Sequence, residues 1–174
     1  MSDGYDTEVD VDGNGTWDAH WTESDGHGGE YVYADMNGDG KADFIGHDTD
    51  SNGTIDSAEY DNNYDGYFEQ HTGDTNGDGY QNVEASDNNA DGTVDEKGVD
   101  TNQDGYFDER AYDHNEDGKA DEYTADTNQD KHDDYDAKDV NYNGTWDVET
   151  ADTNYDGTYD TVHYDNNEAN PYAS

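Results

Sequence analysis

The chain repeats one short motif with a fixed period of 13 residues. The motif reads Asp-x-Asn-x-Asp-Gly-x-x-Asp, is followed by four variable residues, and is complete in residues 100–108. Asp10 opens an early copy whose spacer is one residue shorter. The later copies open at Asp35, Asp48, Asp61, Asp74, Asp87, Asp100, Asp113, Asp126, Asp139, Asp152 and Asp165. A fixed period predicts a repeat architecture in which each unit packs against its neighbours.

A longer period, of two motifs, lies on top of the first one. Every second copy has Thr directly after its opening aspartate, at Thr49, Thr75, Thr101, Thr127 and Thr153. The alternate copies mostly carry other residues there. One turn of the repeat therefore contains either one motif or two, and the longer choice predicts a flattened coil with a loop at each edge.

The composition leaves little material for an apolar core. The formal net charge is −42 and hydrophobic residues make up 28% of the 174 residues. Such a chain cannot offset a conformational entropy cost of roughly 1–2 kcal/mol per residue by apolar burial alone. It is therefore either disordered or held together by cations. The fixed register of Asp, Asn and Gly favours cations, because disorder requires no register.

The motif has the ligands that calcium prefers. Calcium binds six to eight oxygen atoms, and alternate side chains of a tight loop aim at one centre. Positions 1, 3 and 5 of the motif offer Asp or Asn, position 7 a backbone carbonyl and position 9 an acid. Gly at position 6 permits the sharp turn. Of the eleven copies that begin at Asp10 and at Asp35 through Asp152, only one lacks this Gly, and it has Lys131 instead.

We therefore expect about eleven calcium ions, one in each of these loops. The expected side-chain ligands are Asp10, Asp12, Asn14, Asp18, Asp35, Asn37, Asp39, Asp43, Asp48, Asp50, Asn52, Asp56, Asp61, Asn63, Asp65, Glu69, Asp74, Asn76, Asp78, Asn82, Asp87, Asn89, Asp91, Asp95, Asp100, Asn102, Asp104, Asp108, Asp113, Asn115, Asp117, Asp121, Asp126, Asn128, Asp130, Asp134, Asp139, Asn141, Asn143, Asp147, Asp152, Asn154, Asp156 and Asp160.

The core Asp-x-[Asp/Asn]-x-[Asp/Asn]-Gly resembles the EF-hand loop and its relatives, the dockerin and thrombospondin type 3 repeats. The resemblance covers nearly the whole chain and implies calcium binding. The chain departs from these families in three ways. Position 12, where an EF-hand has a bidentate Glu, holds Glu only at Glu59. About four residues separate successive loops, too few for flanking helices, and the cysteines of thrombospondin repeats are absent.

The segments between the loops predict very short strands. Position 8 is mostly apolar, as at Ile55 and Phe107, although Gln81 and Asp133 break the pattern. Position 12 is mostly small, as at Gly46 and Gly98. We expect a mainly β and irregular fold without long helices, a calcium-stabilised repeat solenoid with a thin core between two sheets. Its plan is akin to the calcium β-roll of repeats-in-toxin proteins, whose nonapeptide motif the chain lacks.

We expect one repeat domain over residues 1–174. Residues 1–34 form an irregular N-terminal cap, in which residues 22–34 are a degenerate copy of the motif that keeps Glu30. Residues 35–164 contain ten regular repeats, and residues 165–174 form a truncated C-terminal cap.

These features predict a structural calcium-binding protein that folds into a rigid rod when the metal binds. The alternatives are a calcium buffer and a protein that binds ice or mineral surfaces through its row of threonines. We do not expect an enzyme, because all the paired carboxylates belong to the repeat and none has a distinct environment.

The charge also restricts the partners. Six basic residues cannot neutralise a nucleic-acid backbone, and no apolar stretch approaches the ~20 residues of a membrane-spanning helix. We expect calcium ions as partners, no nucleic acid, no membrane insertion, and end-to-end self-association of rods. Residues 1–6 do not have the basic and apolar regions that are typical of a secretory signal. Weak sites of this kind fill at extracellular calcium levels, which predicts an extracellular or cell-surface location, with the cytoplasm as the alternative.

Overall fold

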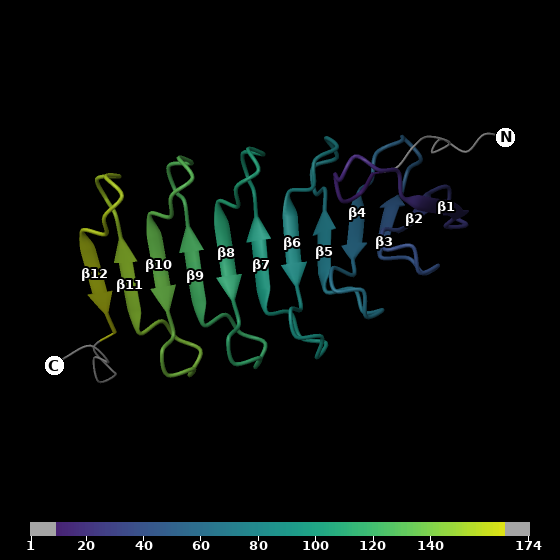
Figure 1. The fold of residues 1–174 in the computed structure, drawn as a ribbon. Helices are drawn as coiled ribbons and strands as arrows, with labels where there is room; N and C mark the ends of the chain where they lie inside the picture. Colours follow the sequence, from purple (N-terminus) through teal and green to yellow (C-terminus); the bar gives the residue numbers. More distant parts are fainter. Residues whose placement is uncertain (1–9, 166–174) are drawn as a thin grey trace. The chain divides into compact units, whose positions relative to one another are not determined.

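The computed structural model describes residues 10–165, and every regular element in this part of the chain is a β-strand. This confirms the predicted β-rich repeat architecture without long helices. The twelve strands follow the sequence in order (Figure 1). They are β1 (Ala19–Ser24), β2 (Glu30–Asp35), β3 (Phe44–Asp48), β4 (Ser57–Tyr60), β5 (Gln70–Gly73), β6 (Val83–Ser86), β7 (Glu96–Val99), β8 (Glu109–Tyr112), β9 (Glu122–Ala125), β10 (Tyr135–Lys138), β11 (Val148–Ala151) and β12 (Thr161–Tyr164). Within these residues, no helix exists that could cross a membrane.

The chain divides into two compact units. The first contains the described residues up to Glu84 together with Asn88–Ala90, and the second contains Ala85–Asp87 and the described residues from Asp91 onward. The expectation of a single repeat domain stays a prediction, as do the two terminal caps, whose residues 1–9 and 166–174 lie outside the described part.

Each 13-residue repeat supplies one loop and one four- or five-residue strand, at positions 10 to 13 of the motif. Neighbouring strands are antiparallel, from β1 to β5 in the first unit and from β7 to β12 in the second. Successive loops consequently lie at opposite edges of the sheet (Figure 1). Every second loop of a unit lies on the same edge. The two-motif period therefore corresponds to a pair of antiparallel strands with one loop at each edge.

Backbone hydrogen bonds close most of the loops between two strands. The amide of Asp43, at position 9, donates to the carbonyl of Ala34 over 2.8 Å, and the amide of Asp61 donates to the carbonyl of Asp43 over 2.8 Å. The same two bonds recur along the chain, for example from Asp121 to Tyr112 and from Asp139 to Asp121. The acids at positions 1 and 9 are thus fixed by the strand ladder on either side of the loop.

The first unit has a small apolar cluster on one face of its sheet. Ala34, Phe44 and Ala58 are buried there, and partly buried Val11, Met36, Ile55 and Tyr60 pack against them. Ile55, at position 8, lies over Gly46, at position 12 of the preceding repeat, where an added Cβ would be 2.9 Å from its Cδ1. At this pair, the large residue at position 8 leaves no room for a Cβ at position 12.

The second unit uses the same pairing around Phe107. An added Cβ on Gly98 would lie 2.9 Å from the Phe107 ring, and the Arg110 guanidinium lies 5.0 Å from the centre of that ring. The sequence predicted an apolar position 8 and a small position 12, but the predicted core between two sheets is wrong. The strands of each unit form one sheet, and the position 8 side chains fold back onto that same sheet.

The first hairpin lies where the degenerate copy of the motif was expected. Residues 22–34 comprise the end of β1, a short turn at residues 25–29 and most of β2. The Asp25 carboxylate accepts the amides of His27 over 2.7 Å and Gly29 over 2.9 Å. Gly29 is required here, because an added Cβ would lie 2.6 Å from both the Asp25 Oδ2 and the Asp48 carbonyl oxygen.

Candidate metal centres

The residues predicted as ligands occupy two different environments. Position 1 is buried in nine of the eleven loops and position 9 in eight, whereas position 5 is exposed in all of them. Sixteen acidic residues are buried in the described part of the chain, against seven apolar ones. The interior next to each loop therefore consists mainly of carboxylates.

The Asp35 loop shows how these carboxylates are held. Asp35 Oδ1 accepts the amide of Gly38 over 2.7 Å, and its Oδ2 accepts the amide of Gly40 over 2.8 Å. The opposite acid, Asp43, accepts the amides of Met36 over 2.9 Å and Asn37 over 3.1 Å. Both carboxylates are thus oriented by the backbone of their own loop.

This arrangement recurs throughout the array. The position 6 amide donates to the position 1 carboxylate in all eleven loops, over 2.5–2.9 Å. The position 2 amide donates to the position 9 side chain in ten loops, over 2.7–3.3 Å. The position 7 amide donates to the position 5 side chain in all eleven, over 2.7–3.1 Å.

The backbone of each loop contains two left-handed residues, of which the sequence predicted one. Position 6 has φ between 73° and 97°, and its Gly was expected to adopt that conformation. Position 4 is also left-handed, with Gly in three loops and φ of 56–63° in the other eight, at Ser51, Tyr64, Ala90, Gln103, Glu116, Gln129, Tyr142 and Tyr155. Gly13, Gly38 and Gly77 at position 4 were the sequence signal for this requirement.

The backbone amides favour the ionised form of the acids that they contact. The amide of Gly79 holds the pKa of Asp74 below its usual range. Burial alone would raise the pKa of Asp152, but the amides of Gly157 and Asp156 outweigh it and lower that pKa. Amide dipoles do not cancel a full negative charge, and buried anions are stable only when they are paired or bound to metal.

Three loops bring three acidic groups together. One carboxylate oxygen from each of the three residues lies within 4.8 Å of the others in the groups Asp10, Asp12, Asp18; Asp48, Asp50, Asp56; and Asp61, Asp65, Glu69. Within the described residues, the other eight loops do not bring three acids that close together. All eight of those loops have Asn at position 3, as the Asp61 loop does with Asn63, and the amide oxygen of Asn offers a neutral ligand instead of a charge.

The recurring threonines at position 2 are used inside their own loops. The hydroxyls of Thr49 and Thr101 donate to the carboxylates of Asp56 and Asp108. Thr75, Thr127 and Thr153 donate in the same way to the position 9 side chains, over 2.9–3.0 Å. Within each unit, the two-motif period of threonine therefore marks the loops of one edge, in which the position 9 side chain has one more donor.

The two exceptions at position 8 connect loops on the same edge. The Gln81 side chain donates to the carbonyl of Ile55 over 2.6 Å, and Asp133 accepts the hydroxyl of Tyr106 over 3.2 Å. The sequence shows that both residues break the apolar pattern, but it predicted no role for them. Their spacing of 26 and 27 residues matches the distance along the chain between same-edge loops.

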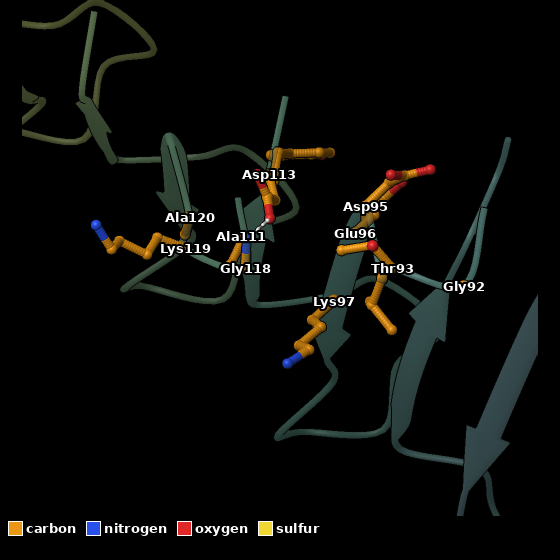
Figure 2. A pocket seen from close by; sticks show the side chains of 12 residues that line it. Gly92, Thr93, Asp95, Glu96, Lys97, Ala111, Asp113, Gly118, Lys119 and Ala120 are labelled. Carbon is orange, nitrogen blue, oxygen red and sulfur yellow. Dashed lines mark hydrogen bonds between the residues drawn. The ribbon is translucent and has the colours of Figure 1, made fainter. Parts of the chain in front are cut away.

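A pocket of about 430 Å³ lies between the Asp87 and Asp113 loops of the second unit (Figure 2). Its lining includes the small side chains of Thr93, Ala111 and Ala120. In the neighbouring repeat, the Phe107 ring fills the corresponding space over Gly98. Asp113 is at the pocket and accepts the Gly118 amide over 2.7 Å (Figure 2). The pocket is therefore a gap in side-chain packing beside a predicted metal loop.

No family model, no curated protein and no solved structure matches this chain.

Proposed function

We propose that this chain is a structural calcium-binding repeat protein, in which the loops take up about eleven calcium ions and metal binding drives folding into a rigid rod. One observation carries the proposal. The interior beside the loops contains sixteen buried acids and only seven buried apolar residues. An interior of this kind is stable only with cations, and the chain has just six Lys and Arg residues to supply them.

The donor set fits calcium. Each loop offers carboxylate and amide oxygens at positions 1, 3, 5 and 9 and a backbone carbonyl at position 7, and calcium accepts six to eight such oxygens with flexible geometry. The fit is strongest where three acids converge, in the loops of Asp10, Asp48 and Asp61. Magnesium is a weaker candidate, because it requires nearly ideal octahedral geometry and keeps much of its water.

Charge explains why folding would depend on the metal. At a formal charge of −42, the free chain repels itself. Eleven calcium ions would reduce the formal charge to about −20 and place positive charge next to the buried acids. Millimolar extracellular calcium would fill weak sites of this type, so we propose that the protein works as a spacer outside the cell or at its surface.

The test is a calcium titration of chain that has been stripped with EDTA, followed by far-UV circular dichroism, with magnesium as the control. We expect a cooperative gain of β-structure in calcium alone. Metal analysis of the dialysed protein should then give about eleven calcium ions per chain. An unchanged spectrum, whether of a folded or of an unfolded chain, would contradict the proposal.

The titration also separates this function from a calcium buffer. A buffer requires submicromolar affinity in the presence of excess magnesium, whereas a spacer requires only saturation at millimolar calcium. The proposal therefore predicts a folding midpoint between roughly 10⁻⁴ and 10⁻³ M calcium.

A further inference from the structure

One loop of the array has a cationic side chain where every other loop has Gly. Lys131 is at position 6 of the Asp126 loop and adopts φ 73°, a conformation that Gly adopts at low cost. Its amide still donates to Asp126 Oδ2 over 2.6 Å, so the loop keeps its geometry. Lys131 therefore adopts a strained backbone conformation that the Gly of the other ten loops adopts at low cost, and it places a charged side chain in the loop.

That side chain reaches the preceding loop on the same edge. The Lys131 ammonium lies 3.0 Å from the carbonyl oxygen of Asp104 and 3.4 Å from its Oδ1. Asp104 is position 5 of the Asp100 loop and one of the expected calcium ligands. The ammonium thus shares a carboxylate with the predicted metal site of a neighbouring loop.

Two more contacts hold the same pair of loops together. The Gln129 side chain donates to the Thr101 hydroxyl over 3.1 Å, and the Tyr106 hydroxyl donates to Asp133 over 3.2 Å. An isolated, half-exposed ion pair has little effect on stability. Here the contacts on either side fix the two loops, so that the ammonium stays next to Asp104.

On the opposite edge of the same unit, an acidic side chain, instead of a lysine, lies next to position 5 of the preceding loop. Glu116, at position 4 of the Asp113 loop, hydrogen-bonds Asp91, which is position 5 of the preceding loop on that edge. Position 5 of one loop is therefore next to an acid on one edge and next to a lysine on the other.

We propose that Lys131 is a specificity-determining residue that makes the Asp100 loop bind calcium more weakly than the other loops of its unit. The inference rests on the proposed calcium binding. Two cationic groups on one carboxylate repel each other, and Coulomb's law in a watery surface site makes the effect about tenfold in affinity. The ammonium replaces part of the charge that calcium supplies elsewhere, and the Asp100 loop fills last.

The experiment follows single loops by the NMR signals of their position 6 amides during a calcium titration of the whole chain. Gly105 reports on the Asp100 loop and Gly118 on the Asp113 loop. After the chain has folded, we expect the Gly105 signal to keep shifting until the calcium concentration is about tenfold above that which saturates Gly118. In Lys131→Met, which keeps the backbone strain but removes the charge, the two signals should saturate together.

Two further variants complete the design. Lys131→Gly removes the charge and the backbone strain together, so it folds at least as well as the parent chain. In this variant too, the Gly105 and Gly118 signals should saturate at the same calcium concentration. Lys138→Met is the matched control, because this lysine of β10 pairs with Glu122 and Asp136, neither of which is an expected ligand, and its loss should not alter the lag of Gly105.

The outcomes separate the two proposals. Calcium responses at all glycines with no lag at Gly105, or a lag that survives in Lys131→Met, would overturn the inference and leave calcium binding intact. A titration in which no glycine responds would overturn the proposed function itself.

Discussion

The two compact units contain the same repeat but have different interiors. In the first unit, four apolar residues are buried, namely Val32, Ala34, Phe44 and Ala58, beside six buried acids. In the second unit, only Ala125, Ala137 and Val148 are buried among the described apolar residues, beside ten buried acids.

Aromatic contacts increase the difference. In the first unit, Trp21 stacks on Tyr33 with ring centres 5.3 Å apart, and Tyr31 stacks on His47 at 4.1 Å. Such cross-strand pairs contribute to stability without any metal. The same motif is therefore supported by more apolar packing in the first unit than in the second, and under the proposed function we expect the second unit to depend more on calcium.

Removing calcium should have the largest effect and tests this difference directly. With EDTA, we expect amide hydrogen exchange in β9, β10 and β11 to accelerate by roughly a hundredfold or more, because the buried acids lose their counterions. Strands β2 and β3 should lose less protection. Exchange measured by mass spectrometry, with magnesium as the control, gives both values. Equal acceleration in both units would show that the apolar cluster does not matter.

Truncating the largest buried side chain of the first unit should give the next largest effect. Phe44→Ala removes a ring that packs edge-on against Tyr60 at 5.1 Å and should destabilise the first unit by about 3–5 kcal/mol. Val148→Ala, the matched change in the second unit, should cost less because it removes less buried volume. Chemical denaturation with calcium present, followed separately in the two units, measures both. An equal loss of stability at β10 in Phe44→Ala would contradict an effect confined to the first unit.

Removing a buried acid should weaken the second unit even at saturating calcium. Asp121 accepts the amides of His114 over 2.8 Å and Asn115 over 3.0 Å, and Asp121→Ala leaves both donors without a partner. We expect a loss of about 1–3 kcal/mol in the free energy of unfolding, measured by chemical denaturation. Asp121→Asn is the control, because it keeps an acceptor oxygen and should restore much of the stability while lowering the calcium affinity.

Substitutions at position 4 of the motif, the second left-handed position, should change stability by a smaller amount. Tyr142 is half-exposed and has φ 61°. Tyr142→Gly and Tyr142→Ala remove the same ring but differ in the Cβ, so the glycine variant should be more stable by about 1 kcal/mol. Thermal unfolding in calcium measures the difference. Equal stability would mean that the left-handed conformation at position 4 carries no cost.

The smallest effect should come from pH in the first hairpin. The His27 amide, with those of Gly29 and Gly28, lowers the pKa of Asp25 to about 2 from its usual value of 3.8. Because the folded pKa is the lower one, the stabilisation is present above about pH 4 and is lost as the pH falls towards 2. Stability of the β1–β2 hairpin, compared between the parent chain and Asp25→Asn over this interval, should show a steeper decline in the parent. Parallel stability curves for the two proteins would contradict the lowered pKa of Asp25.

The sequence was sufficient to predict the β-class, the loop positions, the apolar position 8 and the small position 12, because each depends on local spacing. Ile55 over Gly46 is such a case. It was not sufficient to predict how many sheets form, because the direction in which a position 8 side chain folds depends on the neighbouring strand. Position 4 was missed because eight of its eleven residues are not Gly.

Contacts between loops could not be predicted either. Lys131 and Asp104 are 27 residues apart, and their meeting requires the knowledge that same-edge loops are neighbours. The exceptions to the consensus, at Gln81, Lys131 and Asp133, were visible in the sequence, and all three form contacts between same-edge loops in the structure. For a repeat protein of this kind, departures from the consensus are as informative as the consensus itself.

The alternation of loops between two edges restricts how the gene can change in length. Deletion or duplication of a single 13-residue repeat would reverse the direction of every following strand and move each threonine-bearing loop to the opposite edge. The pairs that meet between same-edge loops, such as Gln81 with Ile55, would then be separated. Changes by an even number of repeats keep every loop on its own edge, so we expect viable length variants of this protein to differ by whole pairs of repeats.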